Sequence, residues 1–227
     1  MKEKILVIAA HPDDEILGCG GTIAKKIYFE KAEVNTLILS RGIASRENII
    51  DLRLEIKKNS NNAVRANKLL GVKKTEMLNF PDNEFDKVSH LNIVKEIEKK
   101  IVNYKPDTIY THFSGDLNLD HQITNRAVLI ATRPSGVFFV KKIYAFEICS
   151  STDWSFNFNN NQFTPNHFED ISKTIRKKIE ALKCYSSEMR KYPHSRSYLN
   201  IKNLAKLRGA TVYTEFAESF VILRSIA

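Results

Sequence analysis

The sequence predicts a single α/β domain built on a mainly parallel β-sheet. Short apolar, β-prone segments alternate along the chain with longer segments whose apolar residues recur every three or four positions. This alternation is typical of βαβ units, which place parallel strands in one sheet and helices on its faces. No linker or internal repeat divides the 227 residues, a length suited to one large domain. We therefore expect a Rossmann-like three-layer fold spanning residues 1–227.

The first strand is expected at residues 5–10, ILVIAA, which are all apolar. Such a run indicates a strand buried on both faces at the centre of a parallel sheet. Pro12 disfavours the α conformation for His11, so the chain should leave this strand still extended. The glycine-rich residues 18–21 should let the backbone approach a neighbour closely, and Thr22 should cap a helix over 23–29.

The later elements are predicted from the same periodicities, with Gly71 and Pro134 marking helix ends. Residues 150–165 are expected to be irregular, because several asparagines there favour turns. The expected strands are 33–40, 75–80, 107–111, 142–148 and 219–224. The expected helices are 46–70, 91–104, 120–132, 168–189 and 199–208.

The composition is that of an ordinary soluble protein, with 43% hydrophobic and 27% charged residues. The six-residue apolar run near the amino terminus is too short for the core of a signal peptide, and no stretch approaches a membrane span. The three cysteines share no zinc-type spacing, which suits a reducing compartment. We expect a cytoplasmic protein without membrane insertion.

The formal net charge of +9 comes from scattered lysine pairs rather than from one basic run. Scattered pairs are typical of solvated helix faces, and the aromatic and basic motif of an RNA-binding sheet is missing from the sequence. We therefore expect no nucleic-acid partner. An anionic small substrate, such as a sugar nucleotide, explains the excess charge equally well. Homo-oligomerisation is left open.

Two clusters of histidines and acids follow the first and fourth expected strands. They are residues 11–15, HPDDE, and residues 112–121, HFSGDLNLDH. The carboxyl edge of an open α/β sheet is where ligands bind, and three adjacent acids call for a neutralising cation or proton. Hydrolytic zinc takes three His, Asp or Glu ligands and leaves a position for water. His11, Asp14 and His121 would make such a set, although the residues alone leave open which of the three acids binds.

Each of these side chains also has a structural explanation. A lone His11 would more often be structural than catalytic, and the acids at 13–15 could favour a helix amino terminus. Asp116 could belong to a turn, and Asp120 could cap the helix that follows it. The occurrence of two clusters at two strand ends favours a metal site over these explanations taken one by one.

Residues 10–15, AHPDDE, resemble the signature of the PIG-L/LmbE family of zinc-dependent N-deacetylases. In that family the first His and second Asp of His-Pro-Asp-Asp bind zinc, the first Asp is the general base, and the His of a later Asp-His pair is the third ligand. The resemblance therefore implies one Zn²⁺ per chain, held by His11, Asp14 and His121. It also implies that Asp13 is the base.

The second motif departs from the family pattern at Asn118, where the family often has a histidine. An asparagine amide can donate a hydrogen bond to an oxyanion but cannot supply a proton. The proton for the leaving amine is therefore expected from protonated Asp13 or from His194. Asp120 is expected to orient His121 or to tune its basicity.

The resemblance extends over nearly the whole chain, and the tail 192–220 matches a subgroup associated with surface-sugar biosynthesis. Arginine suits bidentate binding of phosphate or carboxylate. The residues expected to bind substrate are Arg46, Arg133, Arg196 and Arg208. Solvated surface is an equally good explanation for each of them.

The expected function is hydrolysis of the N-acetyl group of an N-acetyl amino sugar or sugar conjugate, a sugar nucleotide included, with release of acetate. The alternative is a protein that binds a nucleotide or phosphosugar without chemistry. Residues 18–21, GCGG, support that alternative only weakly, because they lack the G-x-G-x-x-G spacing of dinucleotide-binding loops. The sequence does not identify the sugar, its aglycone or the physiological metal.

Overall fold

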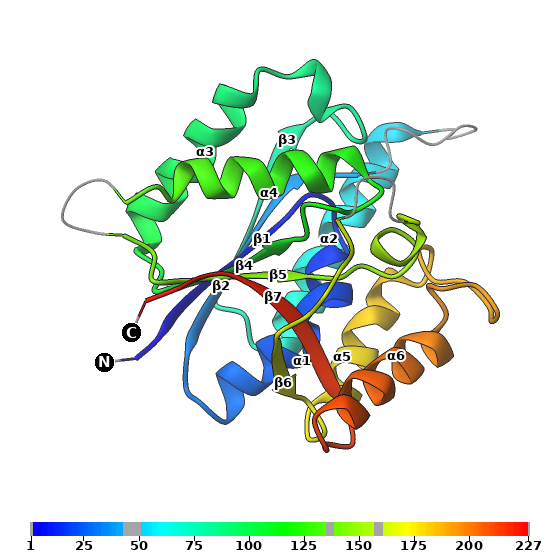
Figure 1. Cartoon of the computed structure of the whole chain (residues 1–227). Coiled ribbons are helices and arrows are strands. Elements are labelled where there is room, and N and C mark those ends of the chain that lie inside the picture. Colours follow the sequence, from blue (N-terminus) through cyan, green and yellow to red (C-terminus); the bar gives the residue numbers. More distant parts are fainter. Residues whose placement is uncertain (1, 43–50, 135–138, 157–160, 227) are drawn as a thin grey trace.

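The computed structural model describes residues 2–42, 51–134, 139–156 and 161–226. Its centre is a seven-stranded sheet in the order β3-β2-β1-β4-β5-β7-β6 (Figure 1). Strands β1 to β5 are parallel, and β7 pairs antiparallel with both β5 and β6. The strands are β1 Lys4–Ala9, β2 Glu33–Ser40, β3 Lys74–Phe80, β4 Thr108–His112, β5 Lys142–Phe146, β6 His167–Asp170 and β7 Ala217–Ser225.

Helices cover both faces of the sheet, so the expected three-layer α/β fold is confirmed (Figure 1). Helices α3 and α4 bury their apolar residues on one face, and α1, α2, α5 and α6 lie on the other. The α-helices are α1 Asp14–Tyr28, α2 Leu52–Leu70, α3 His90–Tyr104, α4 Leu119–Ala131, α5 Ile175–Leu182 and α6 Tyr198–Thr211. Short 3₁₀ helices are η1 Phe85–Lys87, η2 Thr152–Trp154 and η3 Lys183–Tyr185.

The strand order reverses between β1 and β4. After β1 the chain builds outward through β2 and β3, and it then returns to place β4 on the other side of β1. The register pairs Val7 with Tyr110, so the carboxyl ends of the two strands lie side by side. Such a switch point is where open α/β sheets bind ligands.

Helix α1 begins at Asp14, nine residues before the expected start at Ile23. The glycines at positions 18, 20 and 21 lie inside this helix. Neighbouring side chains leave no room there for a Cβ. A Cβ at Gly18 would lie 2.4 Å from Phe146 in β5, and one at Gly21 would lie 2.8 Å from Ile171. The glycines therefore bring the helix close to other elements of the protein, and Thr22 is not a cap.

Helix α1 is kinked at Cys19, where φ is −145° and ψ is 24°. The backbone N–H groups of Gly21 and Thr22 donate to the Glu218 carboxylate at 2.9 and 2.6 Å. Lys178 donates to the Leu17 carbonyl at 2.7 Å and to Glu218 at 2.6 Å. The buried Lys178–Glu218 ion pair thus forms hydrogen bonds with backbone groups on both sides of the kink, with the Leu17 carbonyl before it and two N–H groups after it.

Two further expectations differ from the structure. Residues 168–170 were expected to be helical, but they belong to β6, which pairs with β7. This strand exists through a long-range pairing that local periodicity does not report. The helix expected over 46–70 begins at Leu52 with Asp51 as its N-cap, and residues 46–50 lie outside the described residues. No described helix has the length and apolar character needed to cross a membrane.

The ion pair at the kink generates a stability prediction. Lys178→Met should lower the free energy of unfolding by about 3–5 kcal/mol, because Glu218 would stay buried without a cation. Denaturant unfolding measures this loss. Lys202→Met, at an exposed lysine of α6, is the control and should change stability by about 0.5 kcal/mol or less. Equal stability of the two variants would contradict the role given to the pair.

Candidate metal centre

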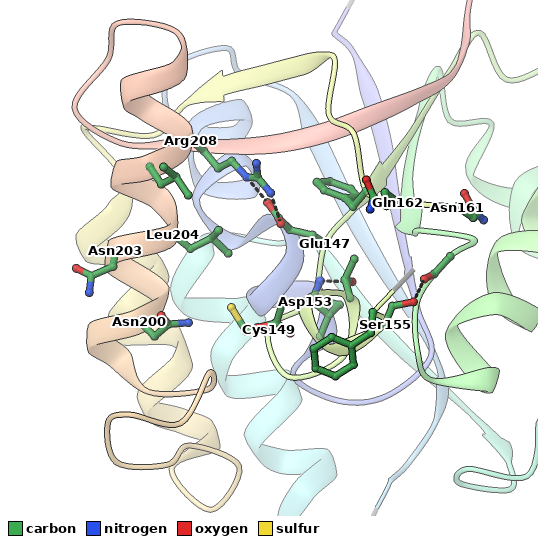
Figure 2. A pocket seen from close by; sticks show the side chains of 16 residues that line it. Glu147, Cys149, Asp153, Ser155, Asn161, Gln162, Asn200, Asn203, Leu204 and Arg208 are labelled. Atoms are coloured by element: carbon green, nitrogen blue, oxygen red, sulfur yellow. Dashed lines mark hydrogen bonds and ion pairs between the residues drawn. The ribbon is translucent and has the colours of Figure 1, made fainter. Parts of the chain in front are cut away.

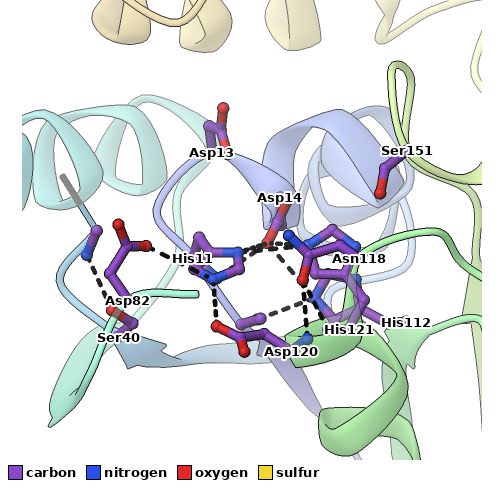
Figure 3. Close-up of polar contacts among 12 residues, drawn as sticks. His11, Asp13, Asp14, Ser40, Asp82, His112, Asn118, Asp120, His121 and Ser151 are labelled. Carbon is purple, nitrogen blue, oxygen red and sulfur yellow. Dashed lines mark hydrogen bonds and ion pairs between the residues drawn. The ribbon is translucent and has the colours of Figure 1, made fainter. Parts of the chain in front are cut away.

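Three side chains converge at the carboxyl ends of β1 and β4 and could hold a metal ion (Figure 3). His11 follows β1, Asp14 opens α1, and His121 lies in the first turn of α4. His11 Nδ1 and His121 Nε2 lie 3.3 and 3.2 Å from Asp14 Oδ2. The two nitrogens lie 3.3 Å from each other.

These separations fit a small divalent cation. Ligands of tetrahedral zinc lie about 2.0–2.1 Å from the metal, and therefore about 3.3 Å from one another. The second oxygen of Asp14, Oδ1, is buried and has no hydrogen-bond partner among the described residues. A buried carboxylate oxygen normally has such a partner. The donor set therefore fits a metal that the family resemblance implies.

A carboxylate faces the outer nitrogen of each histidine. Asp120 Oδ2 lies 2.9 Å from His11 Nε2, and its other oxygen accepts the Phe85 N–H at 3.0 Å. Asp116 Oδ1 lies 3.1 Å from His121 Nδ1. Such carboxylates fix the orientation of metal-binding imidazoles. Asp120 was expected to orient His121 or to tune its basicity, but its carboxylate contacts His11 and the Phe85 N–H instead, because successive residues of a helix point about 100° apart.

Asp116 and His112, which the sequence alone did not single out as site residues, also lie here. Asp116 accepts hydrogen bonds from Ser151, from Thr152 Oγ1 at 2.6 Å and from the Asn118 N–H at 2.8 Å. His112, the last residue of β4, is buried with its ring stacked 3.9 Å from that of His121. The position of His112 at the carboxyl end of an expected strand, where ligands bind in open α/β sheets, is the signal that could have marked it as a site residue.

The charges around the two histidines favour a cation. Burial would lower the pKa of His11, but Asp120 and Asp14 raise it to about 10. Burial would also lower the pKa of His121, but Asp14 and Asp116 raise it to about 9. Burial would raise the pKa of Asp14, yet the surrounding histidines hold it well below its usual value. A bound metal would displace the protons from the two imidazoles.

Asp13 is a buried carboxylate beside these three residues and outside the donor set. Burial raises its pKa well above the usual value, although the Arg196 guanidinium opposes this shift. Arg196 Nη1 donates to Asp13 Oδ2 at 2.9 Å, and its Nε donates to Ser150 Oγ at 2.7 Å. Arg196, far along the chain, thus lies at this site, and contact of its guanidinium with substrate stays a prediction.

A cavity of about 180 Å³ opens onto this centre. Its lining is polar and includes both neighbouring aspartates, the metal-facing histidines and Arg196. Asn118 also lines it, and the Asn118 Oδ1 caps α4 by accepting the Asp120 N–H at 2.8 Å. The Asn118 amide group donates to Asn83 Oδ1 at 2.9 Å. The cap therefore turns the donor end of Asn118 away from the helix.

Two other expected site residues, His194 and Arg133, are not among the described residues that line this cavity. His194 packs against Trp154, with ring centroids 5.3 Å apart, and its Nδ1 accepts the Arg196 N–H at 3.0 Å. Arg133 follows the far end of α4, which returns the chain to the amino edge of the sheet. Arg46 lies outside the described residues.

Arg208 lies in a different cavity, of about 700 Å³, beside α6 (Figure 2). Its guanidinium forms a two-point ion pair with Glu147, at 2.8 and 2.7 Å. Glu147 also accepts a hydrogen bond from Ser219 at 2.8 Å. Arg208 therefore anchors α6 to the sheet, and contact of this residue with substrate remains a prediction.

Fold and side chains together define an α/β protein with a candidate His–Asp–His metal site at the switch point of a mainly parallel sheet. The sequence model of PIG-L, described as GlcNAc-PI de-N-acetylase, matches residues 6–132. The chain belongs to the PIG-L family, which confirms the resemblance found in the sequence.

The relatives include a bacterial protein that spans most of this chain. The uncharacterized deacetylase YaiS of Escherichia coli K12 is 30% identical over 199 residues, which cover 82% of this chain and 92% of YaiS. The probable N-acetyl-α-D-glucosaminyl L-malate deacetylase 2 of Bacillus anthracis is 24% identical over 200 residues, or 81% of this chain and 80% of that protein.

The fold is shared with solved structures of lower identity. N,N′-diacetylchitobiose deacetylase from Pyrococcus horikoshii superposes with a TM-score of 0.79 at 19% identity, covering 97% of this chain and 84% of that one. GalB, a 4-carboxy-2-hydroxymuconate hydratase from Pseudomonas putida KT2440, gives 0.78 at 18% identity, covering 99% and 98%. Because a hydratase shares this fold, the reaction has to be argued from the site.

The ligand geometry predicts the metal content of the purified protein. Elemental analysis should find about one divalent metal per chain, and His121→Ala should lose most of it, because two ligands hold a metal far less well than three. His90→Ala is the control, since His90 lies in α3 and its ring faces the Ile123 carbonyl. Full metal retention by His121→Ala would contradict the ligand set.

Proposed function

We propose that the protein is a zinc-dependent hydrolase that removes the N-acetyl group from an N-acetyl amino sugar or sugar conjugate. The products are acetate and the free amine. The observation that carries this proposal is a three-residue donor set with the buried carboxylate of Asp13 next to it in a polar cavity. The deacetylases among the relatives support the same reaction.

Asp13 is proposed as the general base. When bound, the metal would act as a Lewis acid that lowers the pKa of water and polarises the amide carbonyl. Asp13 then accepts the proton of the attacking water, a step that its raised pKa suits. Arg196 holds the carboxylate through its hydrogen bond at 2.9 Å, so the base keeps one orientation. A further contact of Arg196 with substrate remains part of the proposal.

Asn118 is proposed to donate to the oxyanion that forms on the acetyl group. Its oxygen caps α4 and its amide nitrogen donates one hydrogen to Asn83, so the second hydrogen of that nitrogen is the one proposed for the oxyanion. Fixed donors of this kind stabilise developing charge without reorganisation. The proton for the leaving amine comes from Asp13 after it has accepted one, since His194 packs against Trp154 and is not among the residues that line the cavity.

The alternative, a protein that binds a nucleotide or phosphosugar without chemistry, gains no support from residues 18–21, GCGG. These residues lie inside α1, where Gly18 and Gly21 pack against Phe146 and Ile171. None of them is among the described residues that line the cavity at the candidate metal centre.

The proposal predicts different fates for metal and activity in one variant. Asp13→Asn should retain about one metal per chain and lose activity by about 10²–10⁴-fold, the usual contribution of a general base. Acetate release from N-acetylglucosamine and its conjugates measures activity, and elemental analysis measures the metal. Asp86→Asn, at an exposed aspartate of η1, is the control.

Two outcomes would count against this assignment. Loss of metal together with activity would make Asp13 a ligand, and an active Asp13→Asn enzyme would remove it as the base. A wild-type protein that carries metal but releases acetate from none of these substrates would contradict the proposed reaction.

A further inference from the structure

The backbone of Asp13 has an unusual conformation for a residue with a side chain. Its φ is 107° and its ψ is −30°, although it occupies the N-cap position of α1. An N-cap aspartate is normally extended and accepts a helix N–H with its carboxylate. Within the described structure the Asp13 side chain makes no such bond, and it pairs instead with Arg196. A backbone conformation of this kind persists only where its surroundings hold it.

Glu15 holds this conformation from within the protein. Its Oε2 accepts the Asp13 N–H at 3.0 Å, a bond back to the N-cap like that made by the Glu of a capping box, although Glu15 lies one residue nearer the cap. Its Oε1 accepts hydrogen bonds from Tyr185 Oη at 2.7 Å and from Asn67 Nδ2 at 2.8 Å. All three side chains are fully buried.

The partners of Glu15 come from elements outside the candidate metal centre. Asn67 belongs to α2 and Tyr185 to η3, and neither lines the cavity that opens onto His11 and His121. Asn67 is itself fixed, because its Oδ1 accepts a hydrogen bond from Thr36 at 2.9 Å. Burying a carboxylate costs free energy that hydrogen bonds only offset, so a buried one at this position indicates a role that an apolar side chain could not fill. The proposed mechanism gives Glu15 no task.

We infer that Glu15, Asn67 and Tyr185 form a positioning network for Asp13. The tyrosine and the asparagine fix the Glu15 carboxylate, and Glu15 fixes the Asp13 N–H. The resulting backbone turns the Asp13 carboxylate away from its helix and toward the cavity and Arg196. The inference rests on the proposed function only in taking Asp13 as the base, since the geometry itself is independent of the reaction.

A merely structural network would behave differently on substitution. Loss of a buried hydrogen bond that supports the fold alone lowers stability and leaves the turnover of the folded enzyme unchanged. Loss of a bond that aims the base lowers kcat while KM and metal content stay the same, because substrate and metal are still bound. The two roles are therefore separated by the split between kcat and KM.

The test is Tyr185→Phe, which removes one hydroxyl from the network. We expect kcat to fall by about 10–100-fold, as for other residues that orient a catalytic group from behind, with KM within about twofold and metal content unchanged. Tyr110→Phe is the matched control. Tyr110 is a buried tyrosine of β4 that stacks on Tyr144, with ring centroids 5.2 Å apart, and it should keep its kcat.

A second readout needs no substrate. In protein labelled with ¹⁵N-aspartate, the amide signal of Asp13 reports its hydrogen bond to Glu15, and its absence from Asp13→Asn identifies it. We expect Tyr185→Phe to shift this signal and Tyr110→Phe to leave it in place. The amide signal decides the inference even if the protein deacetylates no sugar, so failure of the proposed function is told apart from failure of the network.

An unchanged Asp13 amide signal in Tyr185→Phe would overturn the inference, as would an unchanged kcat in an active enzyme. If Tyr185→Phe does not fold, Glu15→Gln is judged by the same measurements. This variant keeps the size of the side chain. Its amide N–H group, however, would point at one of the three groups that donate to Glu15, which are the Asp13 N–H, Asn67 and Tyr185.

Discussion

The parallel pairing of β1 with β4 is the constraint on which the site depends. It brings the segment after β1 against the segment after β4, although His11 and His121 are 110 residues apart in the chain. Each segment alone offers too few ligands for a metal. The Asn118 cap then sets where α4 begins, and therefore which of its first residues faces β1. The fold thus decides the chemistry by deciding which strand ends are neighbours.

Burial and nearby charge shift the pKa values of the two adjacent aspartates, Asp13 and Asp14, in opposite directions. Asp14 is surrounded by histidines, which hold its pKa well below the usual value and suit it to bind a cation. Burial dominates at Asp13 and raises the pKa of that carboxyl well above the usual value, which suits it to accept a proton. Neighbouring acids with opposite shifts are a recurrent arrangement in enzymes that use one acid as a base.

Much of the fold was predictable because its strands and helices show local hydrophobic periodicities in the sequence. The uniformly apolar strand at residues 5–10 and the periodic helices predict the parallel half of the sheet and its two helix layers. Strand β6 was missed because it depends on pairing with β7, and the glycines of α1 were misread because their neighbours, Phe146 and Ile171, are distant in sequence. Long-range packing of this kind leaves no local signal.

The place of the candidate site was predictable from two local clusters, which the structure brings together. The choice of Asp14 as ligand and of Asp13 as base came from the family resemblance, because three adjacent acids are not told apart by their sequence. The carboxylates that contact the histidines were predicted less well. Asp120 was paired with its sequence neighbour His121, but it contacts His11, and Asp116 lies next to His121. The arginines of the tail could not be separated by sequence alone. Arg196 reaches Asp13, whereas Arg208 is held by Glu147.

We propose that His11, Asp14 and His121 hold one metal and that Asp13 lies beside it without binding it. Anomalous diffraction from crystals of the purified protein, recorded on both sides of the zinc absorption edge, locates such a metal. We expect a single peak within bonding distance of His11 Nδ1, an Asp14 oxygen and His121 Nε2, with the Asp13 carboxylate outside the coordination sphere. A peak elsewhere in the protein, or a metal bonded to Asp13, would overturn this ligand set.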